Sequence, residues 1–240
     1  MNTAIIWFRK TIRIHDNPML IWAESSQEID SVIPIYIMDE NWNHGDNENC
    51  VGANRINFLY ESLLDLDRNL KEKFGAKLLV YSGNSCEVIE SIIDGIEQKV
   101  SSLLTDYCSE PKNRNDIDGI IRNLDTRDIN TKVFPAVSTI LDIEKITKMK
   151  HFKAPKSTKD MNKIFEENLV ISPCGYLIDG DLPVPNNICC NPLILESIIQ
   201  NERISKFYIP IEEIKEKNYQ LKLETCLLYT SDAADEGLGV

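Results

Sequence analysis

Short apolar runs alternate with helical patterns from residue 3 to residue 136, and this alternation constrains the fold more than any other feature of the chain. The runs are brief and rich in β-branched residues, as in strands that are buried on both faces of a parallel sheet. Strands are expected at 3–8, 31–38, 77–82, 101–107 and 131–136, and helices at 17–28, 51–74, 85–100 and 110–127. Elements that alternate at this spacing form right-handed βαβ units. We therefore predict an α/β fold, a Rossmann-like open parallel sheet of about five strands with helices on both faces.

The alternation stops near residue 150, and beyond it prolines are frequent and only one helix, at 157–169, is predicted. We expect an α/β domain at 1–135, an irregular interdomain linker or wrapping segment at 136–225, and a separate tail at 226–240. The tail reads CLLYTSDAADEGLGV and resembles the translation of sequencing-adapter DNA. This resemblance predicts a sequence artefact, and a natural short tail is the alternative.

Charge and cysteine content limit the classes of partner. The net charge is −12 and the pI is about 4.8, which excludes a nucleic-acid surface spread over the chain because phosphate binding needs clustered Lys and Arg. Seven cysteines, an odd number without a CxxC pair, favour a reduced, intracellular protein. The three histidines lack zinc-site spacing, so no metal site is predicted. No run approaches the ~18 apolar residues of a membrane span, so no membrane partner is expected.

Three fixed positive charges follow the first predicted strand of this acidic chain. Arg9, Lys10 and Arg13 lie in the connection between the first strand and the first helix, and Asp16 lies just before that helix. Open parallel sheets bind ligands outside the carboxyl ends of their strands, where a helix N-terminus adds partial positive charge. Arg55, in the first turn of the longest predicted helix, is expected at the same edge.

These five residues have two interpretations. They contact an anionic ligand or a neighbouring domain, or Arg9, Lys10 and Arg13 fix the turn through local pairs with Asp16, Asp39 or Asp106. Arg55 has the corresponding alternative of a pair with Glu61 or Asp39. The first turn carries no GxGxxG fingerprint, and the chain has neither a GxxxxGK[ST] loop nor a GxSxG elbow. No catalytic residue is predicted.

Four aromatic residues at strand or helix positions, Trp7, Trp22, Phe58 and Tyr60, are interpreted as core or partial core rather than as a chromophore stack. Trp42 lies in a polar loop and is expected to be exposed or to line a cleft.

Several segments together resemble the photolyase/cryptochrome family, and the details are most similar to its animal cryptochrome and (6-4) photolyase branch. The matching runs are WFRKTIRIHDNPML at 7–20, VGANRINFLYESLLDLDRNL at 51–70, LLTDYCSEP at 103–111 and VSTILDIEKITKMKHFKAPKSTKDMNKIF at 137–165. They are collinear with the family pattern and extend over residues 4–165. The family usually has Gly at the position of Thr11 and a His-containing run at the position of VSTILD.

The resemblance implies a protein of two domains. The N-terminal α/β domain binds an antenna folate or deazaflavin in some members, and a larger helical domain binds FAD and carries the tryptophan chain and the DNA-lesion pocket. That helical domain does not fit into the remaining residues, so the resemblance implies a truncated chain that binds no FAD itself. It places Arg9, Lys10, Arg13, Asp16 and Arg55 as antenna or domain-interface contacts.

The predicted function is that of the N-terminal part of a cryptochrome or (6-4) photolyase-like flavoprotein. The resemblance implies blue-light or circadian signalling, or light-driven repair of DNA photoproducts, for the parent protein, with no activity of this chain alone. The missing FAD domain is the expected partner. DNA or clock proteins are partners only through the full-length parent, in the nucleus and cytoplasm. The alternatives are a stand-alone nucleotide-binding α/β protein, as among electron-transfer flavoproteins and universal stress proteins, and a pure protein-interaction module.

Overall fold

The structure of the chain is a computed structural model that describes residues 2–38, 53–108, 111–134, 146–150 and 152–167. The strands are β1 (Asn2–Phe8), β2 (Ser31–Met38), β3 (Leu79–Ser82), β4 (Lys99–Asp106) and β5 (Asn130–Phe134). The helices are α1 (Pro18–Ser25), α2 (Ala53–Phe74), α3 (Ser85–Gly95), α4 (Pro111–Asp125) and α6 (Thr158–Glu167).

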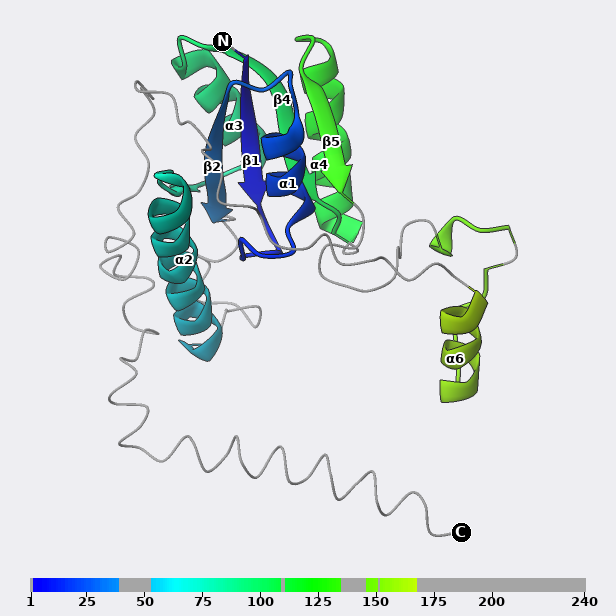
Figure 1. Cartoon of the computed structure of the whole chain (residues 1–240). Coiled ribbons are helices and arrows are strands. Elements are labelled where there is room, and N and C mark those ends of the chain that lie inside the picture. Colours follow the sequence, from blue (N-terminus) through cyan, green and yellow to red (C-terminus); the bar gives the residue numbers. More distant parts are fainter. Residues whose placement is uncertain (1, 39–52, 109–110, 135–145, 151, 168–240) are drawn as a thin grey trace, which may run out of the picture.

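All five strands form one parallel sheet in the order β3-β2-β1-β4-β5 (Figure 1). The chain therefore proceeds outward from β1 to β3, returns to pair β4 with β1, and continues outward to β5. This reversal places a topological switch point between β1 and β4, where doubly wound sheets typically bind ligands. The predicted α/β fold with five parallel strands is confirmed.

Two separate apolar cores cover the two faces of the sheet. On one face α1 and α2 pack against Ile6 and Phe8 of β1, with Leu20, Leu63 and Leu70 fully buried. On the other face α3 and α4 pack against the side chains of β1 that alternate with these. Period-two alternation of a strand that is buried on both sides produces this arrangement, and the burial of every β2 residue has the same cause.

The ends of the predicted elements shift most between α3 and β4. The helix predicted over 85–100 ends at Gly95, and the strand predicted from residue 101 begins at Lys99. Gly95 is a poor helix former, and the following residues gain ladder hydrogen bonds because Lys99 pairs with Asn2 of β1. Pairing with β1 therefore overrides the apolar helical pattern at the end of this segment.

The long helix α2 ends at Phe74 as predicted, and Gly75 follows it with a φ of +63°, the left-handed conformation that suits glycine after a helix. Its buried positions include Leu59, Tyr60, Leu63, Leu66 and Leu70.

The prediction that Phe58 belongs to the core is wrong, because its side chain is 73% exposed. Phe58 precedes Leu59 by one residue, and this turns its side chain away from the buried stripe of the helix. Trp7 and Tyr60 are buried and Trp22 is partly buried, as predicted.

Other predictions fall outside the described residues. These are the polar loop with Trp42, the tail at 226–240, and the proposed segment boundaries after residues 135 and 225. The helix predicted at 157–169 is present as α6. No helix in the described part of the chain is long and apolar enough to cross a membrane.

Candidate ligand site at the carboxyl edge of the sheet

Asp106 joins the two strands that flank the switch point. It is the last residue of β4, and its Oδ2 accepts hydrogen bonds from the backbone N–H of Lys10 (3.0 Å) and of Thr11 (2.9 Å). Lys10 and Thr11 follow β1, so a residue 95 positions away in the chain holds the first turn in place. The Asp106 side chain is buried, with 1% of the residue exposed.

Burial raises the pKa of the Asp106 carboxyl group, and the N–H groups of Thr11 and Lys10 and the nearby Arg9 guanidinium oppose this by lowering it. Arg9 also lies over the ring of Trp7, with its guanidinium carbon 4.6 Å from the ring centroid. The sequence left a local pair of Arg9 with Asp106 open as one of several alternatives. The carboxyl group instead bonds to the backbone beside Arg9, and Arg9 acts on it through its charge.

Arg13 and Asp16 form a local pair. The Nη2 of Arg13 lies 3.3 Å from Oδ2 of Asp16, and its Nε donates to the carbonyl oxygen of His15. Asp16 has a φ of 48°, and the side chain of Asn17 caps α1 by accepting from the N–H of Met19 (3.0 Å) while donating to the carbonyl of Arg13 (2.8 Å). This geometry is the local pairing that the sequence offered as one of its two interpretations.

Arg55 lies near the same edge. Burial raises the pKa of Tyr36 to about 12, while the charges of Arg55 and Arg9 act to lower it and that of Asp106 to raise it. Both arginines and Asp106 therefore lie close to Tyr36, at the carboxyl end of β2. Arg55 is therefore at the carboxyl edge that holds Arg9 and Asp106, where the sequence predicted it.

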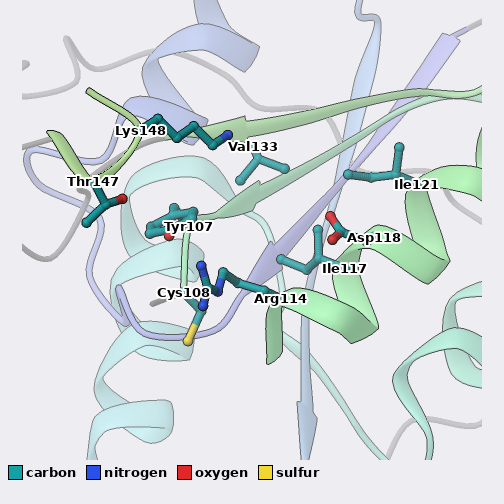
Figure 2. Close-up of a pocket in the computed structure, with 9 residues that line it drawn as sticks. All are labelled: Tyr107, Cys108, Arg114, Ile117, Asp118, Ile121, Val133, Thr147 and Lys148. Atoms are coloured by element: carbon teal, nitrogen blue, oxygen red, sulfur yellow. The ribbon is translucent and has the colours of Figure 1, made fainter. Parts of the chain in front are cut away.

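A pocket of about 440 Å³ lies at the ends of β4 and β5 (Figure 2). It combines an apolar wall from α4 and β5 with two cationic side chains, one carboxylate and several smaller polar groups. The lining residues are Tyr107, Cys108, Arg114, Ile117, Asp118, Ile121, Val133, Thr147 and Lys148.

The pocket borders the core of α3 and α4, since Ile117, Ile121 and Val133 belong to or pack against that cluster. In Figure 2, Thr147 and Lys148 lie at the end of the pocket near Tyr107, and the isoleucines of α4 lie at the opposite end. Sequence reasoning did not single out these residues, because the pocket joins segments from 107 to 148 that are far apart in the chain. The available signals were that β4 ends at the sheet edge where ligands bind, and that the runs 103–111 and 137–165 resemble the family.

The described cysteines, Cys86 and Cys108, are free thiols. No group of three or more potential metal ligands occurs among the described residues.

A doubly wound parallel sheet with charged groups at its carboxyl edge and a pocket at the ends of β4 and β5 defines the chain as a Rossmann-like α/β domain. The sequence comparisons then identify the family. The profile described as DNA photolyase matches residues 4–176, which is more than half of the chain. The chain belongs to the photolyase/cryptochrome family and has the fold of its N-terminal α/β domain.

Curated relatives include a photolyase and several cryptochromes. The (6-4)DNA photolyase of Arabidopsis thaliana is 39% identical over 114 residues, which is 45% of this chain and 20% of the relative. Cryptochrome-1 of Spalax judaei is 35% identical over 157 residues (65% of this chain, 25% of the relative). Cryptochrome-1 of Erithacus rubecula is 34% identical over 191 residues (79% and 29%). The matched part thus spans about a fifth to a third of the length of such relatives.

Solved structures support the fold. The cryptochrome of Synechocystis sp. PCC6803 matches with a TM-score of 0.68 and 24% identity over 88% of this chain and 41% of that structure. An archaeal photolyase from Sulfolobus tokodaii, solved with two FAD molecules, matches with a TM-score of 0.64 and 22% identity over 82% of this chain and 41% of that structure. The family binds the flavin FAD.

Proposed function

We propose that this chain is the α/β part of a cryptochrome or (6-4) photolyase-like flavoprotein, and that the FAD of the parent protein is held by a helical domain outside the α/β domain. The observation that carries the proposal is the extent of the match. The match to cryptochrome-1 of Erithacus rubecula covers 79% of this chain but only 29% of that relative. Most of the relative therefore lies beyond the matched part. The proposed roles of the parent are light-driven repair of a DNA photoproduct, or blue-light and circadian signalling in the nucleus and cytoplasm.

A flavin-binding experiment tests this proposal on the protein as it exists. The purified chain is mixed with FAD, desalted and measured in the visible absorption band of flavins. We expect no retained flavin and no photoreduction, because the FAD site is proposed to lie in the other domain. Stoichiometric retention of FAD would contradict the proposal and would favour the alternative of a stand-alone nucleotide-binding protein.

The downstream coding sequence provides a second test. Full-length transcripts of the gene should continue from the α/β domain into a helical domain with a FAD-binding pattern. A stop codon after an intact natural exon for residues 226–240 would instead favour the protein-interaction module.

A second role, binding of an antenna folate or deazaflavin, is favoured by the pocket at the ends of β4 and β5. Its volume of about 440 Å³, its apolar wall and the cations Arg114 and Lys148 suit a planar ligand that carries a carboxylate. The five residues predicted from the sequence would be an alternative site for the same ligand.

Fluorescence titration with methenyltetrahydrofolate or 8-hydroxy-5-deazaflavin separates the two sites. We expect Arg114→Ala to weaken binding at least several-fold, whereas Arg122→Ala, on the same helix outside the pocket, leaves binding unchanged. Loss of binding in Arg13→Ala, with Arg114→Ala unaffected, would move the proposed site to the basic turn.

A further inference from the structure

Two consecutive backbone N–H groups converge on one carboxyl oxygen at the switch point. The donors are Lys10 and Thr11, directly after β1, and the acceptor is Oδ2 of Asp106, at distances of 3.0 and 2.9 Å. Thr11 and Asp106 are almost completely buried, with 3% and 1% of each residue exposed. The contact is therefore shielded from water, and its geometry is set by the pairing of β1 with β4.

In nucleotide-binding α/β domains, the backbone N–H groups that follow the first strand commonly hold an oxygen of a phosphate group. The surroundings here have the same electrostatic character. Arg9 lies close enough to lower the pKa of Asp106, and Lys10 and Arg13 belong to the same connection. The turn thus has the features of an anion site, and a side chain of the protein itself supplies the oxygen.

We propose that Asp106 acts as an internal substitute for a phosphate oxygen and thereby excludes phosphorylated ligands from the amide groups after β1. Any ligand at this edge then binds through side chains, as in the pocket that begins at Tyr107, and not through a phosphate held by the first turn. Asp106 is a specificity-determining residue in this sense. The inference does not depend on the proposed function, because it concerns only the chemistry of the switch point.

Removing the carboxyl group should create the site that it fills. In Asp106→Ala the N–H groups of Lys10 and Thr11 lose their acceptor, and inorganic phosphate can enter beside Arg9. We expect Asp106→Ala to unfold at a lower temperature than the wild type in chloride. Saturable phosphate binding should then raise its Tm by roughly 3–6 °C at about ten times Kd. The measurement is thermal unfolding in phosphate and in chloride at matched ionic strength and pH.

Phosphate also stabilises proteins generally by exclusion from their surface, so the deciding quantity is the difference between variant and wild type. Asp67→Ala is the matched control, because Oδ1 of the buried Asp67 accepts from only one N–H group, that of Leu78 (3.0 Å), while its Oδ2 pairs with the cation Lys71. Asp106→Asn is the isosteric control, because its amide oxygen still occupies the position. Neither control should gain the phosphate-specific increase.

Three results would overturn the proposal. The first is a phosphate-specific increase of the wild type as large as that of Asp106→Ala. The second is a folded Asp106→Ala protein without any such increase. If Asp106→Ala is unfolded in chloride, phosphate should restore its fold, and failure of both this variant and Asp106→Ser to respond is the third.

Discussion

At the scale of single residues, Asp106 should measurably affect how the free energy of unfolding depends on pH. Burial raises its pKa in the folded chain above the ordinary value of 3.8. As the pH rises above about 4, the unfolded chain releases this proton before the folded chain does, so the linkage contribution to stability falls until the folded pKa is passed. We therefore predict that the free energy of unfolding of the wild type, relative to Asp106→Asn, decreases with rising pH over this window. Urea unfolding of both proteins at several pH values measures it, and an increase with pH would show that the N–H groups and Arg9 outweigh burial.

A second prediction at this scale concerns Arg9 and Asp106. Arg9 contacts the Trp7 ring and acts on the Asp106 carboxyl group through its charge, while the direct hydrogen bonds come from the adjacent backbone. We expect Arg9→Ala to destabilise the chain by roughly 1–2 kcal/mol through the lost ring contact and charge. A double-mutant cycle with Asp106→Asn should give a coupling energy above about 0.5 kcal/mol. A coupling indistinguishable from zero would show that Arg9 stabilises the turn independently of Asp106, and Arg9→Lys separates the charge from the ring contact.

Residue by residue, the sequence located the charged turn but could not specify its contacts. It named Arg9, Arg13, Asp16 and Asp106, and the structure places them at the ends of β1 and β4 or in the turn between β1 and α1. Asp106 accepts its hydrogen bonds from backbone N–H groups, which every residue except proline carries. No pattern of side chains in the sequence could therefore predict these bonds. They arise only because strand pairing brings residues 10, 11 and 106 together.

At the scale of secondary-structure elements, α2 provides a test of the buried stripe. Leu63 is fully buried between the helix and the sheet, whereas Phe58 is 73% exposed on the same helix. We predict that Leu63→Ala costs about 2–5 kcal/mol of stability, because it leaves a cavity in the core. Phe58→Ala should cost less than about 1 kcal/mol in the isolated chain. Denaturant unfolding measures both variants. A large loss for Phe58→Ala would mean that this side chain packs against a part of the chain outside the described residues.

Element boundaries were predictable where local chemistry agrees with tertiary pairing. The start of α1 and the end of α2 lie within one residue of the expected bounds, because the Asn17 cap, Pro18 and Gly75 act within a few residues. The α3–β4 junction was misplaced because pairing of Lys99 with β1 depends on a partner almost a hundred residues away. The strand order was not predicted either, because the alternation of strands and helices does not determine on which side of β1 the fourth strand pairs.

At the scale of the whole molecule, net charge determines whether the chain binds nucleic acid. The net charge is −12, so the chain as a whole repels phosphate backbones. The basic residues of the first turn cannot reverse this, because Arg13 pairs with Asp16 and Arg9 lies over Trp7 and close to Asp106.

We predict no gel shift with damaged or undamaged duplex DNA at physiological salt, where non-specific binders have dissociation constants of about 10⁻⁴–10⁻⁶ M. A basic DNA-binding protein in the same gel serves as the positive control. A tight, lesion-selective shift by this chain would contradict the prediction, and would mean that a DNA-binding surface lies within the 240 residues rather than in the domain proposed to carry the FAD.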